Sequence, residues 1–369
     1  MNILIVGEFS SFAKNLKAGF KALGHNVLIV YTGDGFKSIK CDNSDIVYNP
    51  SPEIRICGFR IPKSHLFLSI FENKRIQNII GSAKYDLIII INECFVSHLI
   101  TEPGVSINFI ENQKKKGAKV IFTSCGRDVP HRLYCHEMRY FKEKYPLGMT
   151  PPVTKEDICR FKKLMSCVDV VIPTGYDYLF PMKRFEEDMK LGLRVSSVVP
   201  LPIKIDDCQI STCVGRKINI LHGIIRAQQK GSKYFLEALE YIKNKYFDRV
   251  NITIVERLPL DEYLRIFDEC DILLDQNTSY CLGMNAEIGL MKGKVVLGGN
   301  ELEEQLELGY CSPVINVIPN TGQIVGEIEA LINNPEKIDA IKLESRRYAE
   351  TYLNAVEIAK RYLSELEII

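Results

Sequence analysis

Three motifs are missing from this sequence, and each absence disfavours a class of site. The twelve cysteines include no CxxC pair, so the usual spacing of a zinc site is not present. Neither G-x-G-x-x-G nor G-x-x-x-x-G-K-[ST] occurs. The two absences disfavour a dinucleotide fingerprint and a phosphate-binding P-loop.

The sequence also lacks a long apolar run and an excess of either charge. Its most apolar stretch, residues 87–91, is far shorter than the roughly 20 residues that span a bilayer. A net charge of +1 gives no reason to expect nucleic acid as a partner. No signal peptide precedes the first apolar run at residues 2–6, so we expect a protein of the reducing cytosol. The basic runs 114–116 and 142–144 would allow peripheral contact at the inner membrane face, or are simply solvated helix ends.

The first half of the chain alternates apolar runs with amphipathic segments, which predicts an α/β fold. An apolar run at 2–6, an amphipathic helix over 12–23 and a second run at 27–31 form a βαβ unit. Such a unit implies a right-handed crossover and a parallel sheet. We expect further strands at residues 86–91, 118–123, 168–173 and 198–203, and a mobile loop over 146–152.

The second half begins in the same way as the first. We expect strands at 217–223, 250–255, 271–275, 294–297 and 314–317, separated by helices, and two final helices over 322–333 and 335–368. At 369 residues the chain is too long for one ordinary core. Pro200 and Pro202 suit an extended connector, because proline fixes φ and disfavours a preceding helix, and we place the hinge within residues 200–215. We therefore predict domains at 1–205 and 206–345, with a final segment at 346–369.

Two turns of the second half have the chemistry of anion-binding sites. Arg226 and Lys230 lie between glycines in a loop that follows a strand and enters a helix. Gly283 precedes a short helix that carries Glu287, and a helix N-terminus offers unpaired N–H groups to phosphate. Together the two turns would bind a diphosphate, and Glu287 would accept hydrogen bonds from a ribose. Alternatively, these residues are solvated loop charges and a partner of the helix dipole.

Asp128 and His131 follow the strand expected at 118–123. Ligands of doubly wound sheets collect at the carboxyl ends of strands, so either side chain would serve as a general base or bind a substrate hydroxyl. The alternative interpretation is a helix N-cap and a surface histidine.

The second half resembles the glycosyl transferases group 1 family, retaining enzymes of family 4-like type with the GT-B fold. Residues 283–296, GMNAEIGLMKGKVV, resemble its segment of glycine, Glu-Ala-Met and Gly-Lys-Pro-Val-Val. Residues 222–232, HGIIRAQQKGS, resemble its Arg…Lys-Gly loop, and residues 126–128 resemble a Gly-Ser-Asp turn of some members. The resemblance implies two Rossmann-like domains that face each other across a cleft, with a C-terminal helix crossing back to the first domain.

The resemblance also implies roles for single residues. Arg226 and Lys230 would neutralise the departing diphosphate, and Glu287 would hold the ribose of a UDP- or GDP-linked sugar. Asp128 or His131 would position a hydroxyl acceptor, either a glycan or a lipid-linked molecule of polysaccharide biosynthesis. Donor contacts are expected from the following residues: Gly7, His222, Gly223, Arg257, Gly283, Met284, Asn285 and Glu287. No metal or other cofactor would be needed, which fits the lack of an Asp-x-Asp motif.

One departure from the family pattern keeps two other functions open. The first glutamate of its Glu-x7-Glu pattern should fall at position 279, where this chain has serine. The alternatives are a non-catalytic homologue that binds a nucleotide sugar and a GT-B-fold sugar-nucleotide epimerase. The nucleobase, the donor sugar, the acceptor and the oligomeric state stay open.

Overall fold

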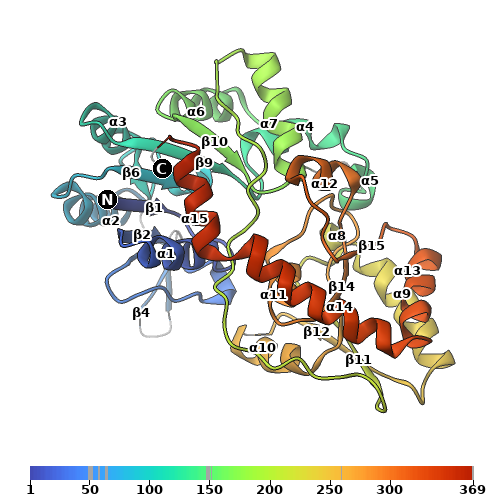
Figure 1. The fold of residues 1–369 in the computed structure, drawn as a ribbon. Coiled ribbons are helices and arrows are strands. Elements are labelled where there is room, and N and C mark those ends of the chain that lie inside the picture. The colour runs from blue at the N-terminus through green and yellow to red at the C-terminus, as the bar shows by residue number, and fades with distance from the viewer. Residues whose placement is uncertain are drawn as a thin grey trace.

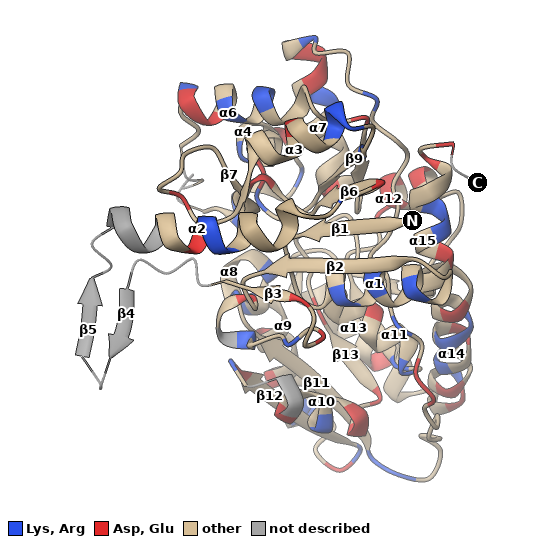
Figure 2. Ribbon diagram, turned by 90° about the vertical axis from the view of Figure 1, so that its left-hand side faces the viewer, with Lys and Arg blue, Asp and Glu red and all other residues tan. Residues whose placement is uncertain are grey.

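The computed structural model describes residues 1–48, 53–56, 59–62, 65–146, 150, 152–258 and 260–367. They form two α/β lobes, each built on a parallel sheet with helices packed against it (Figures 1 and 2). The predicted loop at 146–152 lies largely outside the described residues.

The first lobe has a six-stranded parallel sheet with the order β10-β9-β6-β1-β2-β3. Its strands are β1 (Asn2–Val6), β2 (Asn26–Tyr31), β3 (Ile46–Val47), β6 (Leu87–Ile90), β9 (Lys119–Ser124) and β10 (Val170–Pro173). Its helices are α1 (Phe12–Ala22), α2 (His65–Gly81), α3 (Ile107–Lys115), α4 (Val129–Tyr134), α5 (Phe141–Lys144), α6 (Lys155–Met165) and α7 (Tyr176–Met189). Short elements complete the lobe: η1 (Gly35–Lys37), β4 (Glu53–Ile56), β5 (Phe59–Pro62), η2 (Glu93–Phe95), β7 (Val96–Ser97), β8 (Val105–Ser106) and η3 (Cys135–Glu137).

The second lobe has a five-stranded parallel sheet with the order β12-β11-β13-β14-β15. Its strands are β11 (Ile218–Ile224), β12 (Val250–Glu256), β13 (Ile272–Leu274), β14 (Val295–Gly298) and β15 (Ile315–Asn316). Its helices are α8 (Ala227–Lys230), α9 (Ser232–Lys245), α10 (Leu260–Glu269), α11 (Met284–Met291), α12 (Leu302–Leu308), α13 (Thr321–Ile332) and α14 (Pro335–Tyr348). The chain ends with the π-helical turn η4 (Ala349–Leu353) and α15 (Ala355–Ser364).

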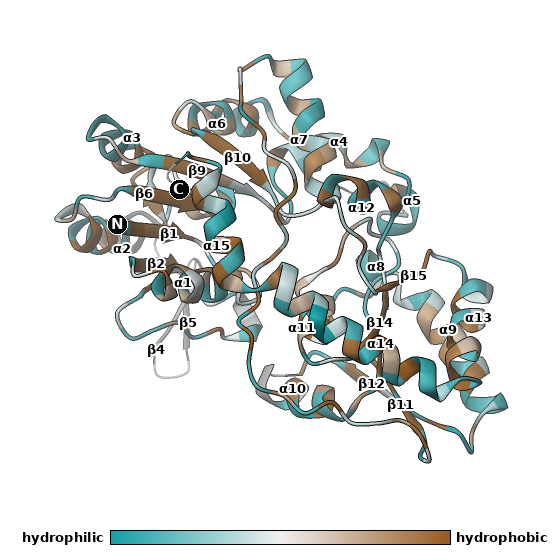
Figure 3. Ribbon diagram, in the orientation of Figure 1, coloured by the Kyte–Doolittle hydropathy of each residue, from teal (hydrophilic) through white to brown (hydrophobic). Residues whose placement is uncertain are grey.

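The central strands are apolar throughout because helices cover both faces of each sheet. All four residues of β6 are fully buried, and they pair in register with β1 and β9. Figure 3 shows the same pattern as brown strands β6, β9 and β10 inside the first lobe. This order of elements agrees with the predicted α/β fold.

The last helix returns to the first lobe. In Figure 1 the red α15 lies beside the blue α1, and the two helices pack closely. A Cβ added at Gly19 of α1 would lie 2.0 Å from the carbonyl oxygen of Ala355, so only glycine allows this approach. Tyr362 is fully buried there, 3.2 Å from the hydroxyl of Thr123 on β9.

Two predictions about segments that connect the lobes were wrong. The strand expected at 198–203 is extended chain with a single bridge, Ile203 to Asn354. Pro200 and Pro202 lack the N–H groups that a sheet ladder needs. The single helix expected over 335–368 is divided by η4 and by the extended conformation of Asn354, where the chain turns toward the first lobe.

Candidate functional site

A cavity of about 470 Å³ lies between the two lobes. The first lobe contributes Ser10 and Ser11 in the turn before α1, and Lys14 in the first turn of α1. The second lobe contributes the loop after β11, the end of β12, and the start of α11. Of the predicted site residues, the cavity is lined by Gly223, Arg226, Lys230, Arg257, Gly283, Met284 and Asn285. The structure therefore brings both predicted anion-binding turns to one cavity.

The loop after β11 carries the two predicted cations. Arg226 precedes the single turn of α8, which ends at Lys230, and Gly231 follows in the left-handed region with φ +67°. A Cβ at Gly231 would lie 1.8 Å from the side-chain oxygen of Asn277. Both the backbone angle and the close contact therefore require glycine at position 231.

A buried carboxylate joins this loop to the turn before α11. Asp275 follows β13, is 1% exposed, and its Oδ1 lies 2.6 Å from Lys230 Nζ. The same oxygen accepts a hydrogen bond from the Asn285 amide at 3.0 Å, and the hydroxyl of Tyr263 donates to Asn285 Oδ1 at 2.8 Å. Sequence reasoning missed Asp275 and Tyr263, although a carboxylate at the carboxyl end of a buried strand is a recognisable signal.

The start of α11 suits an anion. Gly283 is its N-cap residue, in an extended conformation, and no side chain caps the helix. The first N–H groups of a helix have no partner within the helix, and the helix dipole is positive at this end. Gly283, Met284 and Asn285 line the cavity here, so a phosphate in the cavity would lie within reach of these groups.

Glu287, predicted to hold a ribose, does not line the cavity. Its side chain is 2% exposed, and Oε2 has no hydrogen-bond partner among the described residues. Burial raises the pKa of Glu287 well above its usual range. The ribose contact stays a prediction that this arrangement does not display.

His222 and Gly7 do not line the cavity either. His222 is fully buried, with Nδ1 2.9 Å from the Leu274 carbonyl oxygen and Nε2 3.0 Å from Ser232 Oγ. Burial lowers the pKa of His222 to about 4, so the ring is neutral near pH 7 and ties β11 to β13 and α9. Gly7 has φ +105°, and a Cβ there would lie 2.2 Å from the ring of Phe95.

Asp128 and His131 do not line the cavity either. Asp128 is the N-cap of α4 and accepts hydrogen bonds from the His131 N–H at 2.9 Å and Ser124 Oγ at 2.5 Å. Burial raises the pKa of Asp128 to about 6. His131 is 4% exposed, so its interpretation as a surface histidine was wrong, and burial lowers its pKa to about 4. The helix-cap interpretation of Asp128 fits this geometry.

The cavity carries an excess of positive charge. Its described lining includes one acidic residue, Asp206, and seven basic ones: Lys14, Lys37, Lys204, Arg226, Lys230, Arg257 and Lys292. Several of these are paired with carboxylates, whereas no ion pair is found for Lys14 or Arg226 within the described chain. A cleft of this kind favours an anionic ligand.

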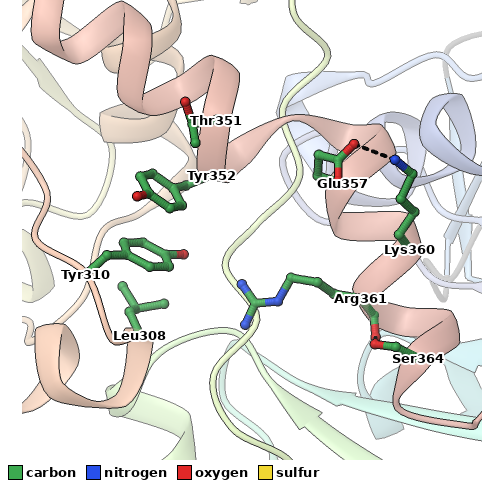
Figure 4. A pocket seen from close by; sticks show the side chains of 8 residues that line it. All are labelled: Leu308, Tyr310, Thr351, Tyr352, Glu357, Lys360, Arg361 and Ser364. Atoms are coloured by element: carbon green, nitrogen blue, oxygen red, sulfur yellow. Dashed lines mark hydrogen bonds and ion pairs between the residues drawn. The ribbon is translucent and has the colours of Figure 1, made fainter.

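Among the described residues, no group of three His, Cys, Asp or Glu side chains is placed to hold a metal ion. A second cavity of about 430 Å³ is lined by residues near the end of α12 and by η4 and α15 (Figure 4). Tyr310 and Tyr352 stack there with ring centroids 3.9 Å apart. None of the predicted site residues lines this second cavity.

Solved structures share the whole arrangement of the two lobes. A sucrose-phosphate synthase from Thermosynechococcus elongatus aligns with a TM-score of 0.61 at 12% identity, over 99% of this chain and 98% of the other. The TarM G117R mutant of S. aureus, in complex with UDP, aligns with a TM-score of 0.61 at 9% identity over 98% of both chains. Anabaena HepE, in complex with UDP and glucose, aligns with a TM-score of 0.59 at 12% identity over 100% of both chains.

The chain has a GT-B fold. It comprises two Rossmann-like lobes that face each other across a cleft, and its C-terminal helix crosses back to the first lobe. No family model matches the sequence. No curated protein matches it either. The solved structures with this fold include glycosyltransferases and complexes with UDP, and one of them is described as a UDP-N-acetylglucosamine 2-epimerase from Listeria monocytogenes, at 13% identity with a TM-score of 0.52. Membership of the group 1 family stays a prediction.

Proposed function

We propose that the protein is a retaining glycosyltransferase that moves a sugar from a UDP- or GDP-linked donor to a hydroxyl of a glycan or lipid-linked acceptor. One observation carries this proposal. The loop with Arg226 and Lys230 and the turn with Gly283 to Asn285 line the same cavity, and Asp275 joins them. That arrangement supplies cations and backbone N–H groups to a diphosphate.

In the proposed reaction, the second lobe binds the donor. Arg226 and the start of α11 stabilise the negative charge that develops on the diphosphate as its bond to the sugar breaks. The ion pair of Lys230 with Asp275 holds the loop in place, and its two charges cancel. Arg226 is then the cation of the described loop that has no ion-pair partner. Arg257 and Leu258 line the same cavity and would flank the nucleobase. No metal is required in this scheme, because these groups neutralise the diphosphate.

The acceptor would enter from the first lobe. Ser10, Ser11 and Lys14 line that side of the cavity, whereas Asp128 and His131, the predicted acceptor residues, lie outside its lining. We therefore assign acceptor binding to the turn between β1 and α1 and to the first turn of α1. None of the described helices combines the length and apolarity that spanning a bilayer would require. A role in polysaccharide biosynthesis at the cytoplasmic face of a membrane belongs to this proposal.

The test is a transfer assay with UDP- and GDP-linked sugars, read as release of free nucleotide with and without a panel of glycan acceptors. We expect acceptor-dependent release that falls at least about 100-fold in Arg226→Ala, because the transition-state charge is left uncovered. Release that survives in Arg226→Ala would overturn the assignment. Arg265→Ala, in the same lobe but outside the described cavity lining, is the matched control.

A second candidate is a protein that binds nucleotide sugars without transferring them. Ser279 favours it, because a carboxylate was expected at this position and serine offers no charge. Calorimetric binding of a nucleotide sugar without transfer to any acceptor would support this candidate. Conversion of the donor without net sugar transfer would support an epimerase.

A further inference from the structure

A carboxylate of the first lobe binds the loop that leads into the start of α11. Asp177 lies in the first turn of α7. Its Oδ2 accepts hydrogen bonds from Ser279 Oγ at 2.7 Å, from the Tyr280 N–H at 2.8 Å and from the Cys281 N–H at 3.1 Å. Its Oδ1 lies 3.1 Å from Lys144 Nζ. One buried side chain thus fixes three consecutive residues of the other lobe.

Asp177 stays ionised although it is buried, and its partner Lys144 is partly buried. Asp177 is 2% exposed, and burial alone would raise its pKa, but Lys144 and the hydrogen-bond donors lower it to about 2. Burial lowers the pKa of Lys144, and Asp177 more than offsets that effect. A buried carboxylate that accepts hydrogen bonds from this many donors makes a specific contact between the lobes. Lys144, expected from the sequence either to contact a membrane surface or to be a solvated helix end, is therefore turned into the protein.

The loop itself continues directly to the cavity. The side-chain amide of Gln276, which lines the cavity, donates to the carbonyl oxygen of Cys281 at 3.0 Å. Gly283, the N-cap of α11, follows two residues after Cys281. A Cβ at Gly175, next to α7, would lie 2.5 Å from Cys281 Sγ, so the two lobes are in close contact at this loop. Any displacement of residues 279–281 would therefore also move the start of α11.

We propose that Asp177 is a positioning residue that holds residues 279–281 so that Gly283, Met284 and Asn285 face the nucleotide diphosphate. This inference rests on the proposed function of the cavity. Position 279 carries no carboxylate of its own but contacts one from the other lobe, so the nucleotide site is in place only while the lobes are in contact. The space beside Asp177 is about 10 Å³, enough for no more than a water molecule, so Asp177 acts through the loop and does not touch a sugar.

The experiment measures UDP binding by calorimetry, well below the melting temperature of each variant. Asp177→Ser removes the carboxylate, and Ser279→Ala removes one hydrogen bond but keeps the pair of Asp177 and Lys144. We expect Asp177→Ser to raise the Kd for UDP at least about tenfold and Ser279→Ala to raise it a few-fold. Lys183→Gln is the matched control, because Lys183 also lies on α7 and pairs with Glu307 of the second lobe at 3.2 Å without contacting the loop. Its Kd should equal that of the wild type.

A double variant that exchanges the two side chains keeps the inference testable if Asp177→Ser misfolds. Ser279→Asp alone places two carboxylates in contact and should bind UDP most weakly, whereas the double variant Asp177→Ser/Ser279→Asp restores one carboxylate and one hydroxyl and should recover affinity. A merely structural role would lower the melting temperature and leave Kd unchanged. Wild-type affinity in both Asp177→Ser and Ser279→Ala, or no recovery in the double variant, would overturn the inference.

Amide hydrogen exchange separates this inference from the function of the cavity. Should the wild type bind neither UDP nor GDP, the proposed function fails, and exchange at Tyr280 and Cys281 still decides the role of Asp177. At least tenfold faster exchange at these amides in Asp177→Ser, absent in Lys183→Gln, would support a loop held by Asp177. Unchanged exchange would contradict it.

Discussion

Lys230 Nζ lies 2.6 Å from Asp275 Oδ1, and this ion pair is 13% exposed on the lysine and 1% on the aspartate. The same oxygen also binds Asn285. Lys230 is therefore a structural cation that fixes the two predicted anion-binding turns relative to each other. Arg226, which has no ion pair in the described chain, is exposed and available to a ligand.

Substitution of the two cations should separate stability from ligand binding. Lys230→Ala leaves Asp275 buried without its cation, and we expect a loss of about 3 kcal/mol in the free energy of unfolding. Arg226→Ala removes an exposed side chain, and we expect a change within about 0.5 kcal/mol. Urea denaturation measures both values. Equal losses in the two variants would show that the ion pair contributes no particular stability.

Gly231 should be among the least replaceable glycines of the site. Gly231→Ala combines a left-handed backbone angle with a Cβ placed 1.8 Å from Asn277 Oδ1, and we expect a loss of about 3 kcal/mol or more. Gly309→Ala is the matched control, because its φ of +76° is similar but its Cβ would enter open space. Its loss should be about 1 kcal/mol. Similar losses of unfolding free energy in the two variants, measured by thermal or urea denaturation, would mean that the chain relaxes around Asn277 without a free-energy cost.

Glu304 should contribute a loss of stability as the pH rises toward 8. Glu304 is 4% exposed and accepts a hydrogen bond from the Tyr176 N–H of the other lobe at 2.5 Å. Burial raises its pKa from 4.5 to about 8. Between these values the folded protein retains a proton that the unfolded chain has lost, so a rise in pH favours unfolding. Above about pH 8 this contribution is constant.

Glu304→Gln keeps an acceptor for Tyr176 but has no proton to lose. Its unfolding free energy should fall less steeply between about pH 4.5 and 8, by up to about 1.4 kcal/mol per pH unit. Denaturant titrations at several pH values measure the slope. Glu344→Gln removes an exposed acid of α14 that is not among the groups raising the pKa of Glu304, and it should keep the wild-type slope. A wild-type slope in Glu304→Gln would show that Glu304 ionises normally.

The fold could be predicted largely because its signals are local. Apolar runs such as residues 87–90 become fully buried parallel strands, and the alternation with helices defines both sheets. The two errors, the strand expected at 198–203 and the single helix expected over 335–368, arose where backbone conformation rather than side-chain polarity determines the structure. Prolines 200 and 202 prevent a strand that their apolar neighbours favour, and Asn354 interrupts a helix whose side-chain periodicity continues.

The site could be predicted only in part, because sequence spacing does not report burial or contacts across the lobes. Arg226 and Gly283 line the cavity as their turn chemistry indicated. Glu287 and His222 have the right residue types but face the interior. The contact between Asp177 and Ser279 joins residues 102 positions apart, and no local pattern points to it.

Calorimetric titration of the wild type and Arg226→Ala with UDP and GDP tests the central claim most directly, namely that the cavity between the lobes binds a nucleotide diphosphate. We expect one site per chain in the wild type for one of the two nucleotides, and a Kd at least about tenfold higher in Arg226→Ala, since a charged hydrogen bond to phosphate is lost. Absence of binding in the wild type, or equal affinity in the two proteins, would contradict the account.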